Sequence, residues 1–156
     1  MILSATGHRP HKLGGYGEGV QGRLVALART ALLELRPSMV ITGMALGWDT
    51  AVAMACQRLA IPYIAAIPFN GQQTAWPPFS RDQWEELVED AVTLKVVCEG
   101  GYAPWKMQVR NEWMVDNSDQ VLALWNGTKG GTANCVAYAE KKNKPIINLW
   151  EKYEQY

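Results

Sequence analysis

Short apolar runs alternate along the chain with longer stretches in which apolar residues recur every three or four positions. The short runs predict strands and the longer stretches predict helices, because the two periodicities differ. The predicted strands cover residues 2–5, 39–42, 62–67, 93–98, 120–124 and 144–149. The predicted helices cover residues 20–35, 49–59, 81–90, 105–117 and 132–142.

This alternation is typical of βαβ units and predicts a mostly parallel sheet. The predicted strands are apolar almost throughout, as expected where helices cover both faces of a sheet. We therefore expect a Rossmann-like α/β sandwich of three layers. A chain of 156 residues, 48% of them hydrophobic, suits one domain with a real core, so residues 1–156 are expected to form a single domain.

The charge balance and the cysteine content make some kinds of function less expected for this protein. The 15 basic and 15 acidic residues cancel, so the broad basic field that dominates nucleic-acid binding is missing. Cys56, Cys98 and Cys135 form no close pair, so neither a metal nor another cofactor is expected. The odd cysteine count favours a reducing, cytoplasmic setting. No apolar run approaches the roughly 20 residues of a membrane span, so no membrane association is expected.

Candidate chemistry gathers where the predicted strands end. In an open parallel sheet, ligands bind beyond the carboxyl ends of the strands. Four polar or glycine-rich loops are expected at that edge: residues 6–9, 42–47, 68–72 and 126–132. Because the topology brings these loops together, the four of them indicate a binding site better than any one does.

Two of these loops place glycines directly before a helix. Gly43 and Gly47 precede the second predicted helix, and Gly130 and Gly131 precede the fifth, with Lys129 beside them. Free backbone amides at a helix start bind anions such as phosphate. The same glycines also suit a tight turn between strand and helix, so both interpretations remain open.

Side chains near these loops add polar candidates. Arg9 follows the first strand and suits a two-point contact with a phosphate or carboxylate, or a pair with Asp49 or Asp119. His8 suits a ligand contact, a general acid or a turn residue. The hydroxyl of Thr132 suits a helix cap or a phosphate contact.

Other candidates lie on a helix and among the tryptophans. Arg110 suits a surface ion pair, and the neighbouring Asn111 suits a hydrogen bond to a base or ribose. Trp48 and Trp76 lie beside loop residues. Each suits either the hydrophobic core or a wall against which a flat ring stacks.

The ordered set of motifs resembles the YpsA-like branch of the SLOG superfamily. The resembling segments are residues 6–10, 42–49, 68–76, 110–119 and 130–133, which together span nearly the whole chain. The superfamily includes LOG-type cytokinin-activating phosphoribohydrolases and the DNA-processing protein DprA. The resemblance implies a Rossmann-like fold with a nucleotide-type ligand over the edge of the sheet, and self-association through helices beside the site.

The sequence departs from the LOG pattern where those enzymes carry their glutamate. LOG-type enzymes cleave the N-glycosidic bond of a nucleoside monophosphate with an arginine, which Arg110 resembles, and a glutamate that follows a Pro-Gly-Gly-x-Gly-Thr loop. Here the glutamate position falls on Asn134 or Cys135, and neither replaces a carboxylate. A hydrolase would take its carboxylate from elsewhere, with Asp49, Asp116 and Glu112 as candidates.

We therefore expect a binder or sensor of a nucleotide, or of an NAD- or ADP-ribose-like molecule, that forms a homo-oligomer. The alternatives are an N-glycosidic bond hydrolase and a DprA-like binder of single-stranded DNA. The expected catalytic residues are Asp49, Arg110 and Asp116. The expected ligand-binding residues are Thr6, Gly7, His8, Arg9, Gly43, Met44, Gly47, Trp48, Pro68, Phe69, Gln72, Trp76, Asn111, Gly130, Gly131, Thr132 and Asn134.

Overall fold

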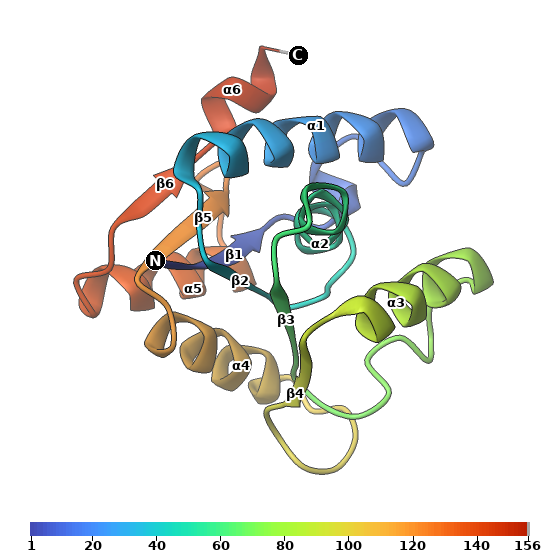
Figure 1. Ribbon diagram of the computed structural model, residues 1–156. Helices are drawn as coiled ribbons and strands as arrows, with labels where there is room; N and C mark the ends of the chain where they lie inside the picture. The colour runs from blue at the N-terminus through green and yellow to red at the C-terminus, as the bar shows by residue number, and fades with distance from the viewer. Residues whose placement is uncertain (156) are drawn as a thin grey trace.

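The computed structural model describes residues 1–155 and contains one six-stranded, all-parallel sheet in the order β4-β3-β2-β1-β5-β6 (Figure 1). The strands are β1 Ile2–Gly7, β2 Met39–Thr42, β3 Tyr63–Ile67, β4 Thr93–Val96, β5 Gln120–Leu124 and β6 Ile146–Asn148. The helices are α1 Glu18–Leu35, α2 Trp48–Leu59, α3 Pro78–Asp90, α4 Trp105–Asp116, α5 Gly131–Lys141 and α6 Trp150–Glu154. A short 3-10 turn, η1, covers Pro10–Lys12.

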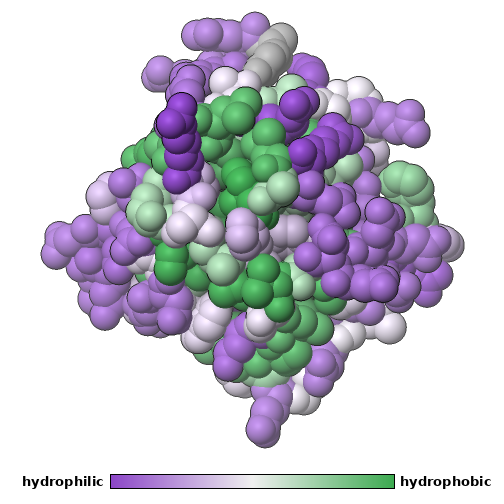
Figure 2. All heavy atoms as spheres, viewed as in Figure 1, coloured by the Kyte–Doolittle hydropathy of each residue, from purple (hydrophilic) through white to green (hydrophobic). Residues whose placement is uncertain are grey.

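The sheet is covered by helices on both faces, as the sequence predicts for a Rossmann-like α/β protein. Helices α1, α2 and α6 lie over one face, and α4 and α5 lie over the other (Figure 1). The first face buries residues such as Leu24 and Val52, and the second buries Val115 and Val136. Figure 2, in the same view, shows apolar residues at the centre of this face of the molecule and polar residues around them.

The predicted strands and the five long helices are all present, and two short elements were not predicted. The turn η1 and the five-residue helix α6 are too short to produce a helical repeat of apolar residues. Helix α3 begins at Pro78, before the predicted start, because a proline is well placed in the first helical turn, where its missing N–H is not needed. No helix within residues 1–155 has the length and apolarity to cross a bilayer.

The strand order places a crevice beside β1. Strand β1 pairs with β2 on one side and with β5 on the other, so successive connections leave the sheet in opposite directions at this point. The loops after β1 and β5 therefore lead to helices on opposite faces of the sheet, α1 and α5. In open α/β sheets, ligands bind at such a switch point.

A close contact between Gly7 and Trp48 fixes α2 against the end of β1. Trp48 is fully buried, and its Nε1 donates a hydrogen bond to the Leu122 carbonyl at 3.3 Å. A Cβ added to Gly7 would lie 2.6 Å from Trp48 Cγ, which no packed structure accommodates without a shift. Trp48 therefore belongs to the core and does not face a ligand, and Gly7 is required by packing.

Replacing Gly7 with alanine should destabilise the protein because the new methyl group overlaps the buried indole. The expected loss in the free energy of unfolding is about 1–3 kcal/mol, measured by urea denaturation. Gly22→Ala in α1 is the control, since an added Cβ there meets no heavy atom within 4 Å. The control should gain about 0.5–1 kcal/mol from helix propensity. Equal stability of the Gly7→Ala variant and the wild type would contradict this packing argument.

Candidate functional site

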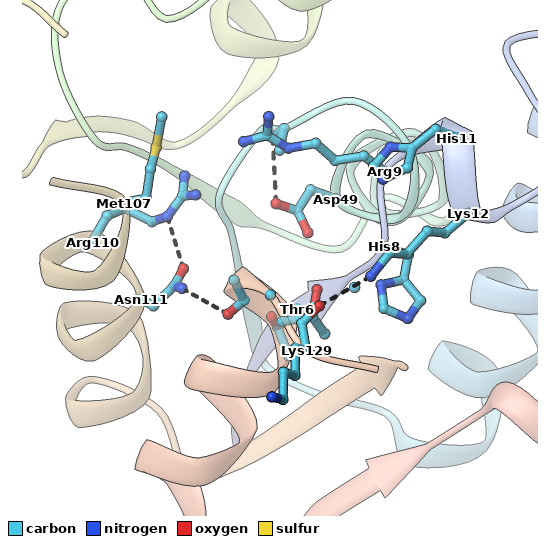
Figure 3. A pocket seen from close by; sticks show the side chains of 15 residues that line it. Thr6, His8, Arg9, His11, Lys12, Asp49, Met107, Arg110, Asn111 and Lys129 are labelled. Atoms are coloured by element: carbon cyan, nitrogen blue, oxygen red, sulfur yellow. Dashed lines mark hydrogen bonds between the residues drawn. The ribbon is translucent and has the colours of Figure 1, made fainter. Parts of the chain in front are cut away.

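A cleft of about 430 Å³ opens at the carboxyl edge of the sheet, between the loops that follow β1 and β5. Its lining residues are Thr6, Gly7, His8, Arg9, His11, Lys12, Ala45, Asp49, Met107, Arg110, Asn111, Lys129, Gly130, Gly131 and Thr132. Figure 3 shows Arg9, His11 and Lys12 on one side and the α4 residues Met107, Arg110 and Asn111 on the other, with Asp49 between them. The structure therefore brings together residues from most of the predicted edge loops.

The N-terminus of α5 opens directly into this cleft. Gly130 precedes the helix with a φ of +142°, a conformation that favours glycine. No side chain among residues 1–155 caps the helix, and its first turn holds no acidic residue. The first intrahelical hydrogen bond runs from the Asn134 amide to the Gly130 carbonyl at 3.1 Å, so the preceding amides have no partner within the helix. This arrangement suits an anion.

The start of α2 does not offer the same site, although the sequence marks it with glycines as well. The Trp48 amide donates to the His8 carbonyl at 3.2 Å, and a Cβ on Gly47 would lie 2.5 Å from that same oxygen. Gly47 therefore serves the packing of two backbones. Gly43 and Met44 are buried and, like Gly47, do not line the cleft. This loop reaches the cleft through Ala45 and Asp49 instead.

The rim of the cleft is positively charged in a protein whose net charge is zero. Arg9 is exposed at the rim, and Lys129 lies on the opposite loop. The Nζ of Lys12 donates to Thr128 Oγ1 at 2.8 Å and to the Lys129 carbonyl at 3.2 Å, which ties η1 to the β5–α5 loop. The cationic groups are thus gathered beside the α5 N-terminus.

His8 also ties the two loops together. Its Nε2 lies 2.8 Å from Asn126 Oδ1 and 3.0 Å from the Asn126 backbone nitrogen. The ring packs edge-on against Trp150 of α6, with 5.9 Å between the ring centroids. Burial lowers the pKa of His8, against the opposing effect of the Asn126 hydrogen bond. His8 is therefore a neutral, buried link between β1 and β5 at the wall of the cleft.

The floor of the cleft holds a buried arginine and a buried carboxylate on either side of Gly43. Arg110 Nη1 donates to the Gly43 carbonyl at 2.6 Å and to the Ala66 carbonyl at 3.3 Å. A Cβ on Gly43 would lie 2.7 Å from Arg110 Nη1 and 2.9 Å from Asp49 Oδ2. Gly43 is therefore needed because only a glycine leaves room for both charged groups.

Burial changes the protonation of this pair. It raises the pKa of Asp49 to about 6, against the opposing attraction of Arg110 and a hydrogen bond from the Ala45 amide. Burial also lowers the pKa of Arg110, and Asp49 opposes that change. Asp49 Oδ1 has no hydrogen-bond partner among the described residues. A buried carboxylate oxygen without a donor is costly, so Asp49 suits a hydroxyl or N–H group of a ligand.

Asn111 connects the floor to the uncapped N-terminus of α5. Its Oδ1 accepts from Arg110 Nε at 3.2 Å, and its Nδ2 donates to the Gly131 carbonyl at 3.4 Å. These bonds orient Arg110 and hold α4 against α5. Asn111 thus acts on the cleft as a link between two helices, in addition to lining it.

A second cleft, of about 440 Å³, holds most of the predicted residues from the loop after β3. Phe69, Gln72 and Trp76 line it. Gln72 is buried with both ends of its amide engaged, because Nε2 donates to the Gly43 carbonyl at 3.0 Å and Oε1 accepts from Trp84 Nε1 at 2.9 Å. Pro68 lines neither cleft.

Two other candidates lie outside both clefts. Asp116 lies in the last turn of α4, roughly 9 Å along the helix from Arg110, and accepts a hydrogen bond from the Tyr138 hydroxyl at 2.8 Å. It is exposed at the far end of the helix, so it does not reach the cleft. Asn134 is exposed on α5 and does not line the cleft either. Within residues 1–155, no three His, Cys, Asp or Glu side chains are grouped to hold a metal ion.

Three residues at the first cleft were missed by sequence reasoning. His11 and Lys12 reach the rim only because η1 folds the chain back after Arg9. Met107 faces the cleft from the first turns of α4, where nothing in the sequence distinguishes it from a core methionine. Their positions depend on a short turn and on the orientation of one helix.

Comparison with known proteins places this cleft in a family. The sequence model of the YspA SLOG family matches residues 3–149. The uncharacterized SPbeta prophage-derived protein YoqJ of Bacillus subtilis (strain 168) is 32% identical over 138 residues, which cover 78% of this chain and 81% of that protein. A UPF0398 protein of Bacillus thuringiensis (strain Al Hakam) is 25% identical over 158 residues, covering 94% of this chain and 86% of that protein.

Solved structures share the fold at low sequence identity. DNA processing protein A (DprA) from Streptococcus pneumoniae has a TM-score of 0.67 and 16% identity over 94% of this chain, which spans about half (49%) of that protein's length. DprA from Helicobacter pylori, whose structure is described in terms of single-stranded DNA binding, has a TM-score of 0.67 and 20% identity, covering 95% of this chain and 64% of that one. The molybdenum cofactor carrier protein from Chlamydomonas reinhardtii has a TM-score of 0.62 and 16% identity, covering 99% and 80%.

The buried Asp49 should make stability depend on pH. Its folded pKa of about 6 lies above the ordinary 3.8, so the folded state holds the proton more tightly between these values. The wild type should therefore lose stability as pH rises from about 4 to about 6, by roughly 3 kcal/mol. The Asp49→Asn side chain cannot ionise, so the variant should not lose this stability. The free energy of unfolding of the variant minus that of the wild type should therefore increase as pH rises from about 4 to about 6.

Urea denaturation of both proteins at pH 4, 5, 6 and 7 measures this difference. Asp82→Asn, which removes an exposed carboxylate on α3, is the matched control. Parallel pH profiles for the wild type and Asp49→Asn would show that Asp49 does not titrate in this range.

Proposed function

The chain belongs to the YspA SLOG family, and from this premise we propose that its first cleft binds a nucleotide-type small molecule through a phosphate group at the N-terminus of α5. The observation that carries the proposal is the uncapped α5 start, with Arg9, Lys12 and Lys129 gathered beside it. Backbone amides and a helix dipole favour an anion there, and the cationic rim adds to that preference.

The floor of the cleft suits the sugar of such a ligand. Asp49 Oδ1 lacks a donor, and a ribose hydroxyl supplies one. Arg110 is committed to backbone carbonyls and to Asn111, so its role is to hold the floor and to balance the charge of Asp49. A ligand with a phosphate at one end and hydroxyl groups near it therefore matches the polar groups that the cleft presents.

The distribution of charge favours a small molecule over a DNA strand. The net charge is zero, and the cations beside α5 belong to one cleft of about 430 Å³. Proteins that bind a single strand line their groove with cations along its whole length. Here, among residues 1–155, Arg9 is the only lysine or arginine that lines the adjoining second cleft. Structural neighbours are described as binding single-stranded DNA or the molybdenum cofactor, so proteins of this fold take ligands of very different size.

Arg9→Gln should weaken the binding of adenosine 5′-monophosphate by about tenfold, because it removes one charged contact to the phosphate. Isothermal titration calorimetry measures the affinity. Arg58→Gln is the control, since Arg58 is exposed in the last turn of α2, outside both clefts. The wild type should also bind the phosphate-free nucleoside adenosine more weakly than the monophosphate. Equal affinity for the two compounds would contradict the proposed binding of the phosphate at the N-terminus of α5.

A second candidate function is hydrolysis of the N-glycosidic bond of a nucleotide. It is favoured by Asp49, a buried carboxyl in the cleft whose pKa of about 6 suits proton transfer near neutral pH. In that reaction, water adds to the anomeric carbon as the bond to the base breaks. Asp49 takes one proton from that water and then passes it to the departing base, so the carboxylate is regenerated. Asp116 and Asn134 lie outside the cleft and have no part in this version.

If the cleft is catalytic, incubation with nucleoside monophosphates or NAD should release free base, as measured by chromatography. Asp49→Asn should reduce the rate at least about 100-fold, because it removes the group that accepts the proton. Asp82→Asn again serves as the control and should keep the wild-type rate. Binding without any release of base would leave the protein a binder and reject this second function.

A further inference from the structure

The first cleft continues into the second. The second cleft, of about 440 Å³, is lined by Arg9, Phe69, Asn70, Gly71, Gln72, Thr74, Ala75, Trp76, Gly101, Tyr102 and Met107. Arg9 and Met107 line both clefts, so the two are adjoining parts of one groove along the carboxyl edge of the sheet. A ligand seated at α5 in the first part can therefore extend past Arg9 into the second.

The two parts differ in chemistry. The first holds the cations and the free amides of α5, whereas the second holds three aromatic side chains, Phe69, Trp76 and Tyr102. Phe69 and Tyr102 meet edge to face, with 5.7 Å between their ring centroids and an angle of 81° between their planes. Tyr102 is 68% exposed, and Trp76 is half-buried, so both leave surface open to a ligand.

The loop that carries Trp76 is held in place by hydrogen bonds of the buried Gln72 and of its own backbone. The buried Gln72 bonds to the Gly43 carbonyl at 3.0 Å and to Trp84 Nε1 at 2.9 Å, and the Trp76 amide donates to the Gln73 carbonyl at 3.0 Å. Trp76 also packs against the core cluster beneath α1 and α2. Since these bonds exist without a ligand, Trp76 is already in position to receive one.

A buried lysine holds the loop that carries Tyr102. Lys106 lies in the first turn of α4, yet its Nζ turns back to donate to the carbonyl of Gly101 at 2.6 Å and to that of Glu99. Burying a lysine is costly unless its charge is satisfied, and here the two carbonyls satisfy it. The result is a fixed position for the residue next to Tyr102.

We propose that the second cleft receives the flat heteroaromatic ring of the ligand, stacked against Trp76 and Tyr102, while the phosphate occupies the α5 end of the first cleft. This inference rests on the proposed function and adds where the base lies and what recognises it. Aromatic side chains and the guanidinium of Arg9 all stack on flat rings, whatever the base. A cleft of about 440 Å³ is of the size that holds small molecules.

The assignment also sets the direction of the ligand. A phosphate gains more from the free amides of α5 and the cations beside them than from the Tyr102 hydroxyl or the Trp76 indole N–H. A flat ring gains little from those amides and stacks on aromatic side chains instead. The exposed Arg9 lies where the two parts meet, so its guanidinium is placed to pair with the phosphate on one side and to lie against the ring on the other. The chemical class recognised is therefore a nucleoside phosphate, with the ring beside Trp76 and the phosphate beside Gly131.

Calorimetric titration with two probes tests this placement. Adenosine 5′-monophosphate should bind the wild type about tenfold or more tightly than ribose 5-phosphate, which carries the same phosphate without a base. Trp76→Ala should reduce the affinity for adenosine 5′-monophosphate toward that of ribose 5-phosphate and leave ribose 5-phosphate binding unchanged. Tyr102→Ala should act in the same direction, and because Tyr102 is 68% exposed, its loss does not threaten folding. Phe79→Ala is the control, an aromatic 67% exposed on α3 outside both clefts.

The outcomes separate this inference from the proposed function. If ribose 5-phosphate binds and neither Trp76→Ala nor Tyr102→Ala changes the affinity for adenosine 5′-monophosphate, the ring does not lie in the second cleft, although the proposed binding of the phosphate at the N-terminus of α5 stands. If neither probe binds the wild type, the proposed function fails as well. If a short single-stranded DNA binds in a Trp76-dependent way while adenosine 5′-monophosphate does not, the stacking surface serves a nucleic acid, and the free-nucleotide assignment is overturned.

Discussion

The cleft depends on the accommodation of Asp49 and Arg110 beside one glycine. The two charges are buried on either side of Gly43, where no side chain other than hydrogen would fit. Burying either charge alone would cost several kcal/mol, and removing one partner of such a pair usually destabilises a protein more than the pair itself stabilises it. Arg110 offsets part of this cost by bonding to the carbonyls of Gly43 and Ala66, which end two neighbouring strands. The ends of β2 and β3 and the middle of α4 are thus held together by the residues that form the floor of the cleft.

The sequence predicted the fold well because the four central strands, β1, β2, β3 and β5, are buried on both faces of the sheet. Strands covered on both faces have apolar residues throughout, and in the helices between them apolar residues recur every three or four positions. The type of each element and its place along the chain therefore followed directly from the residues. The carboxyl-edge rule predicted that the loops carrying Arg9 and Gly131 lie at one edge of the sheet, and both residues line the first cleft. The elements that were missed, η1 and α6, are the ones too short to carry a period.

The structural roles of individual glycines and tryptophans could not be predicted from the sequence, for a physical reason. Gly47 and Gly130 look alike in the chain, but a Cβ on the first would overlap the backbone of His8, whereas a Cβ on the second would meet only Lys12 Nζ, at 3.9 Å. Trp48 and Trp76 both follow loop residues, but only the first fills the core. What distinguishes such residues is the atom on the opposite side, which comes from a distant part of the chain. Periodicity contains no information about that partner.

Arg9 belongs to both clefts, and this has a consequence for how the groove responds to partial ligands. A guanidinium that contacts two halves of a molecule loses its conformational freedom only once when those halves are covalently joined. Two separate fragments would each have to immobilise it, or compete for it. In the proposed mode of binding, the free energies of the two fragments would therefore not add up to that of the intact molecule, and the shared arginine would favour linked over unlinked pieces.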